Sequence, residues 1–188
     1  MFKKRLGEKL GSGGEKDVYV NQENPDRAVG MFNEGRDETT FQIKGRFYLT
    51  KILHLLYPKQ IPDIHLAASD PHMIEVDRVI IGKKFNDRDK KAEMDRDLLT
   101  KKFENLGVIP DYYRTNFGYD QEGNLVYLDS VDPFQGNECF YDPEKIKAAL
   151  EQLENDKKEQ GLVFLKRLEA LRMMEEGFHK EIASSRSK

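Results

Sequence analysis

The chain has 188 residues, a length that fits one domain or two small lobes sharing a cleft. Its formal net charge is −3, so no global positive field favours binding to nucleic acid or to an anionic membrane. The single cysteine, Cys139, excludes an internal disulfide framework and a multi-cysteine zinc site. The basic start lacks the apolar segment of a signal peptide, and no apolar run approaches the roughly 18 to 20 residues that span a bilayer. We therefore expect a soluble, cytoplasmic protein.

The first part of the chain, residues 1–82, is predicted to form five strands and one helix. Apolar residues return as Val18 and Val20 after a glycine-rich turn, a pattern typical of two strands joined by that turn. A wide apolar face at helical spacing predicts a helix that Pro58 ends. In chain order we expect strand, turn and strand over 5–22, a strand over 27–32, the helix over 37–58, and a strand pair over 63–69 and 72–81.

The second part, residues 83–188, opens with a charged segment that marks a junction. A helix is predicted over 90–107, where a glycine stops it, and a hairpin is predicted within 108–134. Asp142 as N-cap and Pro143 at the first helical position predict the next helix. The last helix either packs within the chain or pairs with a helix of a protein partner. Its apolar residues at helical spacing are Leu162, Phe164, Leu165, Leu168, Leu171 and Met174.

The glycine-rich turn between the first two strands consists of Gly11, Ser12, Gly13 and Gly14. Glycine permits positive φ and close approach of the backbone, so such a turn can lay amide groups along a phosphate chain. Dinucleotide-binding and Walker-type loops lead into a helix instead, which disfavours both of those classes. An ordinary hairpin turn is the alternative that this motif alone leaves open.

Three polar residues within 108–134 have a spacing suited to a metal and phosphate site. Asp111 is a carboxylate that can accept a hydroxyl proton, and Asn116 offers an amide oxygen to a hard cation. The hairpin, with its turn at 120–123, then returns the chain so that Asp129 can face the same ion. Each residue taken alone is equally consistent with a turn or a helix cap, and it is the joint spacing that indicates a site.

The order of these features resembles the protein-kinase-like fold. That resemblance implies an α+β fold of two lobes: a five-stranded antiparallel sheet with one helix over 1–82, and a short, mainly helical C-terminal lobe over 83–188. It also implies ATP and Mg²⁺ as cofactors. By the same resemblance Asp111 occupies the position of the catalytic base, and Asn116 and Asp129 occupy those of the metal ligands.

The resemblance extends to nucleotide-binding positions in the first part of the chain. Residues 72–76 resemble the segment that links the lobes, where backbone groups receive adenine, with Glu75 and Val76 as the implied contacts. Val18 aligns with the valine of the family's glycine loop. The glycine-rich turn at 11–14 would cover the phosphates.

Departures from the family pattern concern the cationic side of the site. Ile109 and Pro110 stand where the family has His-Arg, and Gly30 stands where a strand lysine should bind the phosphates. The glycine loop resembles that of the with-no-lysine kinases, which supply the lysine from the position of Lys16; a solvated loop lysine is the alternative. Glu38 is the candidate for the helix glutamate, although it also suits the helix N-terminus.

These residues support two functions of different classes. The first is an ATP- and Mg²⁺-dependent phosphotransferase of the atypical protein-kinase-like class, whose acceptor is a protein, a small molecule or the chain itself. The alternative is a pseudokinase, a nucleotide-binding or scaffolding module whose C-terminal helices engage a protein partner. The missing strand lysine and the short C-terminal lobe support the alternative. A third hypothesis keeps nucleotide binding but transfers another group, such as AMP.

Overall fold

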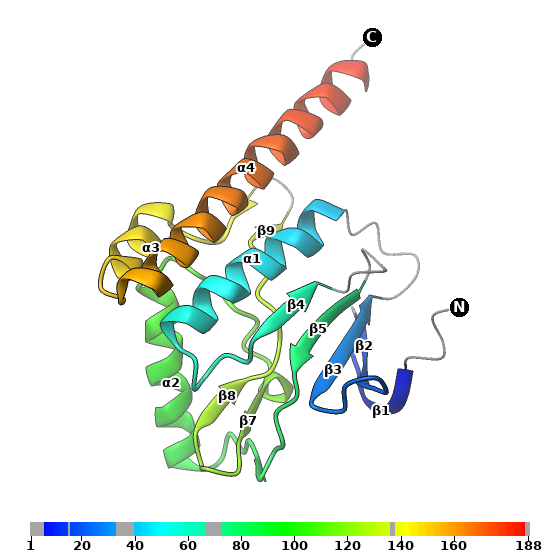
Figure 1. Ribbon diagram of the computed structural model, residues 1–188, viewed down its shortest axis with the longest axis vertical. Helices are drawn as coiled ribbons and strands as arrows, with labels where there is room; N and C mark the ends of the chain where they lie inside the picture. The colour runs from blue at the N-terminus through cyan, green and yellow to red at the C-terminus, as the bar shows by residue number, and fades with distance from the viewer. Residues whose placement is uncertain (1–5, 15, 33–39, 67–72, 136–137, 187–188) are drawn as a thin grey trace.

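The computed structural model is an α+β fold, with an antiparallel sheet in its N-terminal part and mainly helices after it (Figure 1). This is the fold class and the order of elements that the sequence predicts. The structure describes residues 6–14, 16–32, 40–66, 73–135 and 138–186, the last nine of these by their backbone only.

The N-terminal sheet has five antiparallel strands in the order β1-β2-β3-β5-β4, which confirms the five predicted strands. The strand β3 lies at the centre because Ala28 and Val29 are both buried, so the strand is covered on its two faces. Residues 67–72, at the junction of the strand pair predicted over 63–69 and 72–81, lie outside the described residues. The strands are β1 (Leu6–Ser12), β2 (Lys16–Asn21), β3 (Arg27–Phe32), β4 (Ile64–Leu66) and β5 (Met73–Asp77).

The helix α1 (Thr40–Leu56) follows the third strand and ends before Pro58, as predicted. It is buried on two sides. On the sheet side, Ile43 joins a small apolar cluster with Phe32, Ile64 and Ile74. On the other side α1 contributes to the main core of the protein through Leu49, Ile52 and Leu53.

A second, three-stranded sheet carries the predicted hairpin. Its strands β7 (Phe117–Tyr119) and β8 (Leu125–Tyr127) pair with each other, and β6 (Lys83–Lys84) adds a third strand. The sequence did not predict β6, because two lysines carry no strand pattern. The helix α2 (Lys90–Glu104) precedes the hairpin and begins at Asp89, whose side chain accepts a hydrogen bond from a first-turn amide.

Two helices finish the chain, as predicted. The helix α3 (Pro143–Leu150) begins where Asp142 accepts hydrogen bonds from two backbone amides, at 3.1 and 3.2 Å. The helix α4 (Asn155–Arg186) follows it. A short hairpin of β9 (Phe134–Gln135) and β10 (Glu138–Cys139) lies between the second sheet and α3.

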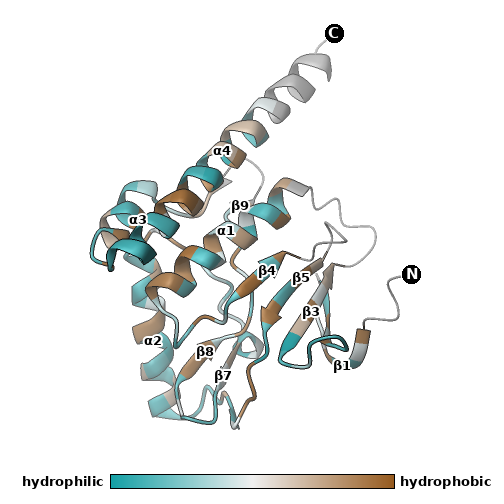
Figure 2. Ribbon diagram, viewed as in Figure 1, coloured by the Kyte–Doolittle hydropathy of each residue, from teal (hydrophilic) through white to brown (hydrophobic). Residues whose placement is uncertain are grey.

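The main core joins α1 to the whole C-terminal part of the chain. It contains Tyr127 of β8, Phe103 of α2 and the buried leucines 165, 168 and 171 of α4. The last helix thus packs within the chain, and it lies along α1 and against α3 (Figure 1). Apolar and polar residues alternate along α4, as expected of a helix with one buried face (Figure 2). Within the described residues, no helix has both the length and the apolar character needed to cross a bilayer.

Gly107, which follows α2, occupies a position in this core where a side chain would be strained and would clash with Asp142. Its φ is 68°, and a Cβ atom there would lie 2.7 Å from the Cβ of Asp142. We expect Gly107→Ala to cost the left-handed backbone penalty of about 1–2 kcal/mol and, in addition, the displacement of the α3 cap. Gly123→Ala is the control, because Gly123 has a φ of 82° but open space around it. Urea unfolding should show the larger loss of unfolding free energy for Gly107→Ala. Equal losses for the two variants would show that Asp142, the cap of α3, moves aside without cost.

Candidate functional site

A cleft of about 780 Å³ lies between the β1–β2 hairpin and the β7–β8 hairpin. Its volume is within the range of small-molecule and cofactor sites. Most of the residues predicted from the sequence line this one cleft, although they come from segments far apart in the chain. They are Gly11, Ser12, Gly13, Gly14, Lys16, Val18, Val76, Asp111, Asn116 and Asp129.

The glycine-rich turn forms one wall of the cleft. The backbone amide of Gly13 donates to the carbonyl of Lys16 at 3.0 Å, which closes the turn. Ser12 faces Asp17 across the hairpin, and its hydroxyl donates to that carboxylate at 2.6 Å. The turn is therefore an ordinary hairpin turn, the alternative that the motif alone left open, and it also lines the cleft.

Lys16 reaches across the neighbouring strand to the opposite side of the cleft. It is the first residue of β2, and a Cβ atom on Gly30 of β3 would lie 3.4 Å from its Cδ. Its ammonium forms an ion pair with Asp129 and donates to the hydroxyl of Ser130 at 3.1 Å. The side chain is only 16% exposed, so Lys16 is not a solvated loop lysine. The missing side chain at Gly30 leaves the space through which the lysine passes.

The carboxylate of Asp129 is held in its charged form. Burial alone would raise its pKa, but the charge of Lys16, the hydrogen bond from that lysine, the amide of Ser130 and the charge of Arg46 together hold the pKa below its usual value. The Ser130 amide donates to Asp129 at 2.8 Å. An ionised carboxylate is the form that a hard cation requires.

The β7–β8 hairpin brings Asn116 next to Asp129, as the sequence predicts. The amide of Leu128, the residue before Asp129, donates to the carbonyl of Asn116 at 2.7 Å. The turn is fixed by Asp120, whose carboxylate accepts from the amides of Glu122 and Asn124 at 2.9 and 2.8 Å. The hairpin thus brings the two candidate metal ligands, Asn116 and Asp129, close together in the cleft.

Asp111 is anchored to the same hairpin. Its backbone amide donates to the hydroxyl of Tyr127 at 3.2 Å, and Tyr127 is fully buried. Burial first, and then the charge of Asp129, raise the pKa of Tyr127, so its hydroxyl stays neutral. The side-chain amide nitrogen of Asn116 donates to the carbonyl of Asp111 at 3.3 Å, which leaves the amide oxygen for a cation. One carboxylate and one amide oxygen fit Mg²⁺, which keeps waters and phosphates as its other ligands.

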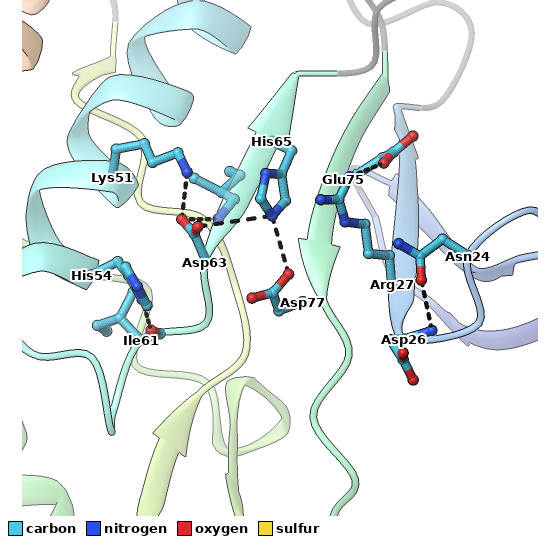
Figure 3. A network of polar contacts seen from close by, with 11 residues as sticks. Asn24, Asp26, Arg27, Lys51, His54, Ile61, Asp63, His65, Glu75 and Asp77 are labelled. Atoms are coloured by element: carbon cyan, nitrogen blue, oxygen red, sulfur yellow. Dashed lines mark hydrogen bonds and ion pairs between the residues drawn. The ribbon is translucent and has the colours of Figure 1, made fainter.

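At the far end of the cleft the lining differs from the expected contacts. Val76 lines it, but Glu75 does not: its side chain pairs with Arg27 at 3.1 Å (Figure 3). The lining continues through Asp77, the last residue of β5, into residues 78–79. The family resemblance places the linking segment at 72–76 and so misses residues 77–79, because β5 itself extends to Asp77.

A polar network holds this end of the cleft. The carboxylate of Asp77 accepts from Nε2 of His65 at 3.0 Å, and the carboxylate of Asp63 accepts from Lys51 of α1 at 2.6 Å (Figure 3). The network ties β4 and β5 to α1.

The helix glutamate was predicted at Glu38, which lies outside the described residues. The helix α1 contributes Arg46 to the site. The side chain of Arg46 is 4% exposed, and its guanidinium binds the carboxylate of Asp132 at 2.8 Å. Sequence reasoning missed Arg46. The available signal was its position three residues after Ile43 and three before Leu49, which puts a charge in the buried stripe of the helix.

A second cavity of about 220 Å³ adjoins the cleft. It shares Asp111 and Asp129 with the cleft, and Arg46, Ser130 and Asp132 add further polar groups to its lining. The two hollows therefore meet at the candidate base and the candidate metal ligand.

Comparison with known proteins gives a likeness of structure and none of sequence. No protein-family model matches the chain, and no curated protein sequence matches it. Among solved structures the chain is similar to the Rio2 kinase of Chaetomium thermophilum in a complex described as Rio2 kinase-ADP/Mg²⁺-phosphoaspartate. The two share 17% identity over 95% of this chain and 68% of that chain, with a TM-score of 0.44. What the site can do is therefore inferred from the geometry of its own residues.

The Lys16–Asp129 pair predicts a pH-dependent contribution to stability. Because the folded pKa of Asp129 is lowered, the contribution is complete above the unfolded carboxyl pKa of about 3.9 and is lost as the pH falls through the folded pKa. We expect Lys16→Met to lower the free energy of unfolding near pH 7 by about 1–3 kcal/mol and to raise the Asp129 pKa in a carboxyl NMR titration. The difference from wild type should shrink in acid.

Lys9→Met is the control for this prediction, because Lys9 forms an exposed ion pair with Asp17 on the same hairpin. It should leave the titration of Asp129 unchanged. An unaltered Asp129 pKa in Lys16→Met would mean that the pair does not persist in solution.

Proposed function

We propose that this chain is an ATP- and Mg²⁺-dependent phosphotransferase of the atypical protein-kinase-like class. The observation that carries the proposal is the course of Lys16. The strand that lacks its lysine has Gly30 there, and the ammonium of Lys16 crosses that gap to the carboxylate of Asp129. The positive charge that the phosphates would need thus comes from Lys16 on the neighbouring strand β2, and it lies beside the candidate metal ligand Asp129.

The cleft offers a consistent place for each part of the nucleotide. The apolar lining, which includes Val18, Ala28, Val76 and Leu128, suits a planar base. The backbone of the glycine-rich turn and the Lys16 ammonium suit the phosphates. Asn116 and Asp129 would hold Mg²⁺, which supplies charge neutralisation of the phosphates when bound.

Asp111 is the group placed to orient the acceptor hydroxyl and take its proton. The smaller cavity opens beside it, on the border with the nucleotide cleft, so an acceptor hydroxyl can approach from there. Positioned proton transfer of this kind contributes about 10²–10⁴-fold to a rate. The proton passes to the Asp111 carboxylate while the hydroxyl oxygen bonds to phosphorus and the nucleoside diphosphate leaves.

A pseudokinase with a protein partner is the second candidate. Its support is the pairing of Lys16 with Asp129, which satisfies both charges without a nucleotide, together with Ile109 and Pro110 beside the candidate base. The last helix supplies a surface for a partner, since its outer face exposes Val163, Met173 and Met174.

Nucleotide binding and turnover separate the two candidates. We expect wild type to bind ATP only with Mg²⁺, with stabilisation of about 2.7 kcal/mol at a ligand concentration 100 times Kd. Asp129→Ala should abolish this Mg²⁺-dependent binding. Asp111→Asn should keep nucleotide affinity but lower turnover about 10²–10⁴-fold, since only the proton acceptor is lost. Direct binding of a fluorescent ATP analogue and release of ADP are the measurements.

Asp97→Asn is the matched control, because Asp97 is an exposed aspartate of α2 that does not line the cleft. It should behave as wild type in both assays. Binding without turnover in wild type would favour the pseudokinase, and no Mg²⁺-dependent binding at all would overturn the proposed phosphotransferase.

A further inference from the structure

The helix α1 docks unusually closely on the segment that follows Asp129. A Cβ atom on Gly45 would lie 2.7 Å from the ring of Phe134 and 2.8 Å from Cγ of Pro133. No side chain larger than hydrogen fits there without a shift, so the glycine sets how near the helix comes to the segment. The contact lies directly beside Arg46, the next residue of the helix.

Arg46 and Asp132 bond across this contact. The guanidinium donates to Oδ2 of Asp132 at 2.8 Å, and the other oxygen, Oδ1, accepts the amide of Phe134 at 3.0 Å. Both side chains are largely buried, with exposed fractions of 4% and 14%. The guanidinium also lies 5.7 Å from the ring centroid of Phe32, on the sheet side of the helix. Arg46 thus holds the sheet, the helix and the Asp132 segment in one arrangement.

In its described range, Thr40–Leu56, the helix α1 has no carboxylate with which to hold Lys16. Between Thr40 and Leu56 the sequence contains neither Asp nor Glu, and the described partners of the Lys16 ammonium are Asp129 and Ser130. Within the described residues, a link between α1 and the site therefore uses another pair of residues. Arg46 and Asp132 are placed to provide it, because Asp132 follows Asp129 by three residues and both line the smaller cavity.

We propose that Arg46 is a positioning residue, which through Asp132 fixes the segment from Asp129 to Phe134 on α1 and so sets the place of the Asp129 carboxylate. The role at the metal rests on the proposed function, whereas the fixing of the segment does not. Arginine suits this task better than lysine, since its planar guanidinium keeps a fixed geometry toward a carboxylate. The consequence is that α1 acts on the site through an arginine–aspartate pair.

The first test removes the pair and follows the segment itself. In Arg46→Met, amide hydrogen exchange over 129–134 should become at least 10-fold faster than in wild type, without nucleotide or metal. Lys51→Met is the matched control, because Lys51 lies on the same helix and loses a part-buried ion pair with Asp63, 2.6 Å long. It should leave exchange over 129–134 unchanged. Unchanged exchange in Arg46→Met would overturn the proposal.

The second test asks whether Arg46 acts through Asp132. Asp132→Asn should give the same loosening, and the double variant should be no worse than either single variant. Additive effects would overturn the route through Asp132. Arg46→Lys should recover part of the protection and remains informative if Arg46→Met does not fold.

The third test concerns the metal. With ATP present, Arg46→Met should require at least 10-fold more Mg²⁺ for half-maximal nucleotide binding, whereas Lys51→Met should not. An unchanged Mg²⁺ requirement beside faster exchange would overturn the metal-positioning part. If wild type binds no Mg²⁺-nucleotide at all, the proposed function fails, and the exchange experiment still decides whether Arg46 fixes the segment.

Discussion

The two-sided burial of α1 is the constraint on which the rest of the structure depends. One side of the helix packs through Ile43 on the N-terminal sheet, and the other packs through Leu49, Ile52 and Leu53 into the main core. Because apolar burial is the dominant favourable term in folding, this helix fixes the first part of the chain relative to the second. The distance between the glycine-rich turn and Asp129, and hence the width of the cleft, follows from that packing.

Local sequence signals predicted most of the fold. Alternating apolar residues around a glycine turn predicted β1 and β2, and Asp142 with Pro143 predicted the start of α3. The spacing from Asp111 to Asn116 and the turn at 120–123 predicted a hairpin that brings polar groups together, and the backbone bond between Leu128 and Asn116 does so. These features depend on residues close in the sequence, where hydrogen-bonding and turn preferences act directly.

The parts that sequence did not predict depend on contacts between distant segments. Nothing in the pattern of α4 indicated that it would lie along α1, because an apolar stripe fits any complementary face. Arg46 was missed because its partner, Asp132, is remote in the chain. The end of β5 at Asp77 moved the cleft lining beyond Glu75, since strand ends are set by pairing with β3 and β4 rather than by composition.

The bond between Lys16 and Asp129 has a consequence for the order of binding. The Asp129 carboxylate has the Lys16 ammonium as its counter-ion, so its buried charge is compensated. A divalent cation arriving alone must compete with that ammonium for the same oxygen. Phosphates offer the ammonium another partner and release the carboxylate. In the proposed function, nucleotide and metal would therefore enter as one unit, because the ammonium of Lys16 already occupies the carboxylate that the metal needs.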